Sequence, residues 1–108
     1  MDQAGDIIVV MTTLPDLDTA QRIARELVNR RLAACASVQG PCRSVFRWQG
    51  AVEEIEEVAL VIKTTQERYA LLERELRVLH PYELPEILAL SAAAGLPPYL
   101  AWVADNTN

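Results

Sequence analysis

Three segments of this 108-residue chain are apolar at consecutive positions, a pattern typical of strands that are buried on both faces. They run from Ile7 to Met11, from Val58 to Ile62 and from Ile87 to Leu90. Only two amphipathic helices are predicted between them, and two helices cover one face of such a sheet. Leaving about six large apolar side chains in water would forgo about 9–18 kcal/mol, at about 1.5–3 kcal/mol each. The sequence therefore predicts that further copies of the chain cover the second face in a closed, symmetric oligomer.

The predicted elements follow one another in the order strand, helix, strand, strand, helix, strand. The first helix follows Asp16, an expected N-cap, and has apolar residues at helical spacing from Leu17 to Val28. The second helix is expected to start with a capping box of Thr64 and Glu67 and to end before Pro81. This order predicts an α+β fold of the ferredoxin-like βαββαβ type, with both helices on the same face of the sheet.

The two central strands are predicted to form a long hairpin. Its first arm runs from Ala33 to Trp48 and is interrupted at Gly40-Pro41 by a bulge or a bend. Gln49-Gly50 is the candidate two-residue turn, because glycine adopts a positive φ at little cost. With this turn Arg43 lies opposite Glu56, and opposite charges across a strand pair favour that register.

Length and composition predict one domain over residues 1–108, with loose polar tails at residues 1–5 and 104–108. A short apolar piece from Tyr99 to Val103 forms a C-terminal extension. No apolar run approaches the ~20 residues needed to cross a membrane, and no signal-peptide pattern is present, so we expect a cytoplasmic protein. The net charge of −5 argues against nucleic acid as the main partner. The two cysteines, Cys35 and Cys42, are too few for a disulfide scaffold and are interpreted as free thiols.

The most distinctive local segment is His80-Pro81-Tyr82-Glu83-Leu84-Pro85-Glu86-Ile87, which connects the second helix to the last strand. Its two prolines stiffen the connector and favour extended backbone in the residues before them. His80 is the only imidazole of the chain and is a candidate metal ligand, for which Glu83, Glu86, Cys35 or a second subunit could supply partners. The alternative is that His80 caps the preceding helix, where a histidine interacts well with the helix dipole.

Several motifs together resemble the CutA family of divalent-cation tolerance proteins, and the resemblance runs from about Ile8 to Trp102. These motifs are Leu32-Ala33-Ala34-Cys35, Ser44-Val45-Phe46-Arg47-Trp48-Gln49-Gly50, Ile62-Lys63-Thr64-Thr65, the connector described above and Tyr99-Leu100-Ala101-Trp102. The resemblance implies a compact, very stable homotrimer of ferredoxin-like subunits, similar in architecture to the PII signalling proteins. It also implies a link to copper and other divalent cations, with no cofactor required.

Two positions depart from the family pattern. Phe46 stands where the family often has tyrosine, so a hydroxyl group is missing from the hairpin. Met11 stands where some members have a copper-binding cysteine, and a thioether favours Cu(I) but is a weaker general ligand than a thiolate.

The candidate metal ligands are soft sulfur atoms, the imidazole and one carboxylate: His80, Cys35, Cys42, Met11 and Glu83. Seven residues apart on a strand, the two cysteines point to opposite faces unless the bulge restores their parity. Four glutamates of the return strand form an acidic edge that either binds cations weakly or keeps the strand solvated: Glu53, Glu54, Glu56 and Glu57.

A second candidate site is a cleft between subunits. Its expected residues are Trp48, Lys63, Tyr82, Glu86 and Trp102. The chain has no glycine-rich phosphate loop, serine elbow or zinc-hydrolase helix, so we do not expect an enzyme. The leading hypothesis is a homotrimer that binds copper or other divalent cations and contributes to the metal-ion response. The alternative is a PII-like signalling module that binds a small anionic ligand in the clefts between subunits.

Overall fold

The computed structural model describes residues 4–108, which form one four-stranded sheet, three α-helices and a short 3-10 helix. In chain order the elements are the 3-10 helix η1 (Ala4–Asp6), β1 (Ile7–Leu14), α1 (Leu17–Asn29), β2 (Cys35–Trp48), β3 (Ala51–Thr65), α2 (Gln66–Leu79), β4 (Leu88–Ser91) and α3 (Pro97–Asp105). Within residues 4–108, no helix has both the length and the apolar character that a membrane span requires.

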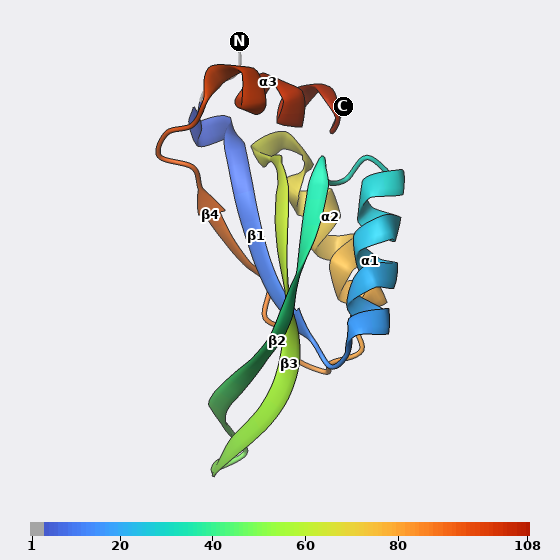
Figure 1. Cartoon of the computed structure of the whole chain (residues 1–108), viewed down its shortest axis with the longest axis vertical. Coiled ribbons are helices and arrows are strands. Elements are labelled where there is room, and N and C mark those ends of the chain that lie inside the picture. The colour runs from blue at the N-terminus through green and yellow to red at the C-terminus, as the bar shows by residue number, and fades with distance from the viewer. Residues whose placement is uncertain (1–3) are drawn as a thin grey trace.

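The strands lie in the order β2-β3-β1-β4, and all neighbouring pairs are antiparallel. Helices α1 and α2 lie on the same side of this sheet, and the β2–β3 hairpin extends beyond the other elements (Figure 1). The molecule is accordingly elongated, with extents of 47 × 26 × 24 Å. This arrangement confirms the predicted α+β, ferredoxin-like βαββαβ fold with a long central hairpin.

The main core lies between the sheet and these two helices. Alternate residues of β1, namely Ile8, Val10 and Leu14, are buried there together with Leu60 and Ile62 of β3. Because successive strand residues point to opposite faces, this alternation turns one set of apolar side chains towards the helices. The helices contribute Ala20, Ile23, Ala24, Leu27, Leu72 and Leu76.

The opposite face of the sheet, called the open face below, is defined by Val9, Met11, Val61, Leu88 and Leu90. Met11 lies opposite both Val61 and Leu88, and Val9 lies opposite Leu90, so these side chains share one face. Leu88 is 55% exposed, Leu90 51% and Met11 38%. The sequence prediction that two helices leave one apolar face uncovered is therefore confirmed for the single chain.

Helix α1 begins and ends as its sequence indicates. The Asp16 side chain accepts a hydrogen bond from the Thr19 amide at 2.8 Å, which confirms the predicted N-cap. The chain leaves the helix through Arg31, whose φ of 59° is in the left-handed region. The amide of Leu32 then donates to the carbonyl of Leu27 at 3.0 Å, which satisfies a helix-end acceptor.

The predicted capping box of α2 is wrong by one residue. The N-cap is Thr65, whose hydroxyl accepts a hydrogen bond from the Arg68 amide. Thr64 is instead fully buried and donates to the carbonyl of Leu32 at 2.7 Å. Helix α2 therefore begins one residue later than predicted, because Thr64 still belongs to β3 and satisfies a buried carbonyl of the loop after α1.

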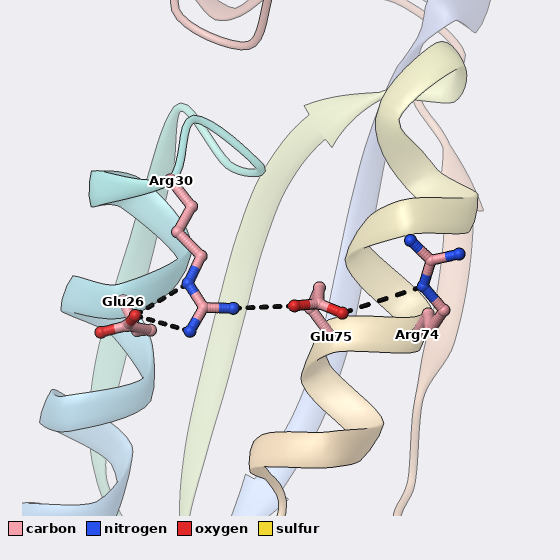
Figure 2. A network of polar contacts seen from close by, with 4 residues as sticks. All are labelled: Glu26, Arg30, Arg74 and Glu75. Carbon is pink, nitrogen blue, oxygen red and sulfur yellow. Dashed lines mark hydrogen bonds and ion pairs between the residues drawn. The ribbon is translucent and has the colours of Figure 1, made fainter.

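One ion-pair network connects the exposed sides of the two helices (Figure 2). Arg30, the C-cap residue of α1, contacts Glu26 at 2.7 Å and Glu75 of α2 at 2.8 Å, and Glu75 lies 3.8 Å from Arg74. The side chains of Arg30 and Glu26 are each 41% exposed, so each pair contributes only about 0.2–1 kcal/mol. The network orients the helices but does not replace their apolar contacts with the sheet.

The hairpin turn has the predicted form. Gln49 and Gly50 have φ values of 49° and 82°, as a type I′ turn requires, and Arg43 lies opposite Glu56. The register shifts between Gln39 and Pro41, where the sequence predicted a bulge. The bulge changes which residues of β2 share a face, and this decides where the two cysteines lie.

Strand β4 begins at Leu88, one residue after the start of the predicted segment from Ile87 to Leu90, and ends at Ser91. In the register of β1 and β4, Glu86 would lie opposite Thr13. The carbonyl of Thr13 instead accepts a hydrogen bond from His80 at 2.9 Å. The connector therefore contacts β1 through the His80 ring, and strand pairing with β1 begins only at Leu88.

The expected loose C-terminal tail at residues 104–108 is wrong. Residues 104 and 105 belong to α3, and Thr107 is 2% exposed. The guanidinium of Arg31 donates to the carbonyls of Asp105 and Asn108 at 2.7 and 3.0 Å, and Arg68 donates to the carbonyl of Thr107. Two arginines far apart in sequence thus hold the tail, and composition alone does not reveal this. Of the expected N-terminal tail, residues 1–3 lie outside the described residues, and Ala4 begins η1.

Candidate functional site

A cavity of about 820 Å³, called the hairpin pocket below, lies where the β2–β3 hairpin extends past the connector. Its walls come from the two hairpin strands, from the end of β1 and from the connector. The lining residues are Thr13, Ser44, Val45, Phe46, Arg47, Trp48, Glu53, Ile55, Glu57, Tyr82, Glu83, Leu84, Pro85 and Glu86. A volume in this range suits a small ligand or a few inserted side chains.

The backbone explains why a pocket forms at this place. Beyond Val58, which lies opposite both Leu14 and Pro41, strand β3 is paired only with β2. The hairpin therefore continues without a second neighbour. The connector crosses beside it and does not pair with it, because proline at position 85 lacks an amide donor.

The buried anchor of the pocket is Glu57, whose side chain is turned to the inside although the sequence predicted a solvated acidic edge. Glu57 is 5% exposed, whereas Glu53, Glu54 and Glu56 are exposed as expected. The hydroxyl of Tyr82 donates to the Oε2 atom of Glu57 at 2.7 Å. Burial and this hydrogen bond raise the pKa of Tyr82, so the tyrosine remains a neutral donor.

No ion pair compensates the charge of Glu57 within residues 4–108. A carboxylate removed from water and held by one neutral donor is costly unless a cation lies nearby. The pocket lining has four glutamates and a single arginine: Glu53, Glu57, Glu83, Glu86 and Arg47. The pocket is therefore acidic and suits a positively charged group.

His80 lies behind the pocket and orients Tyr82. Its Nδ1 atom accepts a hydrogen bond from the Tyr82 amide at 3.2 Å, so this nitrogen carries no proton and Nε2 carries one. Nε2 donates to the carbonyl of Thr13 at 2.9 Å and lies 3.0 Å from the hydroxyl of Thr12. Burial lowers the pKa of His80, which keeps the ring neutral.

His80 stands at the cap position of α2, as the alternative expected, but its neutral ring bonds to β1 and to the Tyr82 amide and not to the end of the helix. The residue is the C-cap of α2, and its own amide donates to the carbonyl of Leu76 at 2.9 Å. Both ring nitrogens are used in hydrogen bonds inside the chain. In this arrangement neither nitrogen is free to bind a metal ion.

The predicted cleft residues separate into two groups in one chain. Trp48, Tyr82 and Glu86 line the hairpin pocket, but Lys63 and Trp102 do not. Trp102 stacks on Tyr99 with a ring-centroid distance of 5.7 Å. The five residues therefore do not form one site within a single copy.

Lys63 and Tyr99 both lie beside Cys35. On the sheet Lys63 is paired with Cys35, and the Cys35 sulfur lies 3.7 Å from the Tyr99 hydroxyl. Burial, and then the contact with Cys35, raises the pKa of Tyr99. Lys63 is half-buried and forms no ion pair or hydrogen bond through its side chain within the part of the chain that the structure describes.

The candidate metal ligands do not come together either. Among the described residues, no three His, Cys, Asp or Glu side chains are placed so that they could hold a metal ion. Cys35 lies opposite Lys63, and Cys42 lies opposite Glu57, which precedes Lys63 by six residues on β3, so the bulge places both free cysteines on one face. At about 3.3 Å per residue they are about 20 Å apart along the sheet. Met11 is on the open face as well, and Glu83 lines the pocket.

The sequence predicts Glu57 only as one of four acidic-edge glutamates, not as a buried residue of the pocket. The spacing along β3 is a signal for its position. Glu57, like Ala59 and Val61, is an even number of residues from Lys63, so all four side chains lie on the same side of the sheet. It also follows directly on the exposed glutamates and precedes the apolar run. Phe46, which lines the pocket, and Tyr99, which contacts Cys35, are further residues that the predicted sites do not include.

Comparison with known proteins identifies the family. The family model for the CutA1 divalent ion tolerance protein matches residues 8–106. The divalent-cation tolerance protein CutA of Thermus thermophilus is 43% identical over 100 residues, which are 93% of this chain and 97% of that protein. The crystal structure of CutA from Xylella fastidiosa is 40% identical, covers 95% of this chain and 99% of that one, and superimposes with a TM-score of 0.92.

A third similar structure is described as the periplasmic divalent cation tolerance protein CutA of Archaeoglobus fulgidus. It is 33% identical, with a TM-score of 0.90, over 94% of this chain and 99% of that one. The structural matches agree with the fold described above. This chain belongs to the CutA family of divalent-cation tolerance proteins.

Proposed function

We propose that the chain assembles as a homotrimer through its open face and that the trimer contributes to the metal-ion response by binding copper or another divalent cation. The observation that carries the proposal is the uncovered row of apolar side chains across β4 and β1, of which Leu88 and Leu90 are both more than half exposed. Single exposed apolar residues are common, but a contiguous apolar face marks a contact surface. Family membership supports divalent-cation tolerance as the role of the assembled protein.

The metal ligands belong to the assembled state, because one chain does not bring enough of them together within residues 4–108. Met11 and Cys35 both lie on the side of the sheet that the partner copies would cover. A thioether and a thiolate are soft ligands, which suit copper in its reduced form. Each copy that meets the others at this face would contribute one Met11 thioether and one Cys35 thiolate. The role is binding and not catalysis, and a cytoplasmic location, with reduced cysteines, is part of the proposal.

A copper titration tests this function. Protein equilibrated with Cu(I) and passed through a desalting column is analysed by metal mass spectrometry, beside a blank without protein. We expect bound copper in the wild-type protein, at least about tenfold less in Cys35→Ser, and no change in His80→Gln, whose ring nitrogens are already used. Copper no higher than in the blank would contradict the metal-binding function.

The alternative function, a small anionic ligand in the inter-subunit cleft, has weaker support. The hairpin pocket is acidic, and the one lysine of the chain is not part of it. An anion would therefore meet repulsion from the pocket side of such a cleft.

A further inference from the structure

Glu57 and Lys63 are charged side chains that are buried or half-buried, have no ion-pair partner within residues 4–108, and carry opposite charges. Glu57 is 5% exposed, and its one side-chain hydrogen bond within the described residues comes from the neutral hydroxyl of Tyr82. Lys63, the only lysine, is half-buried beside Cys35 and forms no ion pair within residues 4–108. Each charge by itself is unfavourable when water is excluded from it.

The two side chains cannot meet within one copy. They lie six residues apart on β3, which corresponds to about 20 Å along the strand. Their even spacing places both on the same side of the sheet, which is the side of the open face. A second copy that covers this face lies against both positions.

The residues around Glu57 and around Lys63 favour a contact between the hairpin pocket of one copy and the Lys63 region of another. The pocket around Glu57 has four glutamates and one arginine and no lysine. The cross-strand neighbours of Lys63 are Val9 and Cys35, neither of which is a carboxylate. A contact in which the Lys63 end of one copy meets the pocket of the next copy is heterologous, and heterologous contacts close into rings when the rotation between copies allows it.

We propose that Lys63 of one copy enters the hairpin pocket of its neighbour and pairs there with Glu57, so that the pocket is complete only in the assembly. Each copy gives one lysine and receives another. The apolar walls of the pocket, which include Trp48 and Phe46, cover the methylene stem of the lysine and exclude water from the pair. This inference rests on the proposed homotrimer and adds the contact that determines how the copies are oriented.

Zero-length crosslinking with a water-soluble carbodiimide tests the contact. The reagent activates a carboxylate, which then forms an amide bond with an amine in direct contact, and Lys63 is the only side-chain amine of the chain. We expect covalent dimers and trimers, and peptide mass spectrometry should identify an amide bond between Lys63 and Glu57. Lys63→Met should abolish this crosslink, whereas Glu67→Gln, an exposed glutamate in the first turn of α2, should leave it intact.

A double-mutant cycle provides a second measurement. It does not require a crosslinking reagent to reach side chains that are buried in the contact. Lys63→Met and Glu57→Gln, which keep the shapes of the side chains, should each raise the subunit dissociation constant at least about tenfold. The subunit dissociation constant of the double variant should be no higher than that of the weaker-binding single variant. With both charges removed, neither charge is left buried without a partner.

The outcomes separate this inference from the proposed function. An assembly whose single-variant effects on dissociation add independently would overturn the Lys63–Glu57 pair and leave the homotrimer in place. Crosslinks from Lys63 exclusively to another carboxylate would also overturn the pair. A wild-type chain that stays monomeric would contradict both proposals.

Discussion

At the residue scale, His80 shows how a polar side chain can be essential for structure and unavailable for chemistry. Its ring connects the end of β1 to Tyr82, and Tyr82 in turn holds Glu57 in the pocket. The sequence identified this connector as special but could not decide between a ligand and a cap. The decision depends on the carbonyl of Thr13, which is 67 residues away in the chain.

This burial predicts a pH dependence of stability. The pKa of His80 is lowered below its ordinary value of 6.5 by burial, so the unfolded chain binds a proton more readily than the folded chain. The stabilisation by neutral His80 is complete above pH about 6.5 and is lost as the pH falls through the folded-state pKa. We expect the free energy of unfolding, measured by urea titration, to decrease from pH 7 towards pH 5.

The variant His80→Gln isolates this contribution, because a glutamine amide can accept from the Tyr82 amide and donate to Thr13 but does not titrate. It should be less stable at pH 7 and show a flatter dependence between pH 7 and pH 5. Equal slopes for the two proteins would mean that His80 is not the group responsible.

At the element scale, the sequence predicted best where the local signal is strong. Asp16, the Gln49-Gly50 turn and the bulge near Gly40-Pro41 each follow from short-range chemistry, and the structure confirms them. The start of α2 was predicted one residue early because Thr64 satisfies a carbonyl from another loop. The C-terminal segment was predicted as loose because Arg31 and Arg68, which hold it, are remote in sequence.

Two adjacent arginines allow a matched test of this C-terminal contact. Arg31→Ala removes hydrogen bonds from a guanidinium to two carbonyls of the tail and should lower stability by about 2 kcal/mol. Arg30→Ala removes only exposed ion pairs and should cost about 1 kcal/mol or less. Hydrogen exchange should become faster at the amides of residues 103–107 in Arg31→Ala alone. Unchanged exchange there would contradict the role of Arg31 in holding the tail.

At the scale of the whole molecule, the apolar pattern of the strands already predicted a second face that needs cover, and Met11, Leu88 and Leu90 are exposed accordingly. The site was less predictable. Trp48, Tyr82 and Glu86 do share a pocket, but the buried state of Glu57 follows from the register after the bulge and from the path of the connector. If the site forms between two copies, a single chain contains only one part of it, the pocket with Glu57 or the Lys63 side chain, at any one contact.

A charge on the open face tests the assembly directly. Leu90→Glu places a carboxylate at the centre of the proposed contact and should produce single chains, since a buried unpaired charge costs several kcal/mol. Val78→Glu is the matched control, because Val78 is 77% exposed on α2, away from this face. It should assemble like the wild-type protein. Dissociation of both variants would show that the effect is not specific to the open face.

The central claim is that copies of this chain cover the open face of one another's sheet. Sedimentation equilibrium of the wild-type protein at micromolar concentration measures this most directly. The account predicts a particle of three times the 12.0 kDa mass of the chain. A folded particle of 12.0 kDa would contradict it.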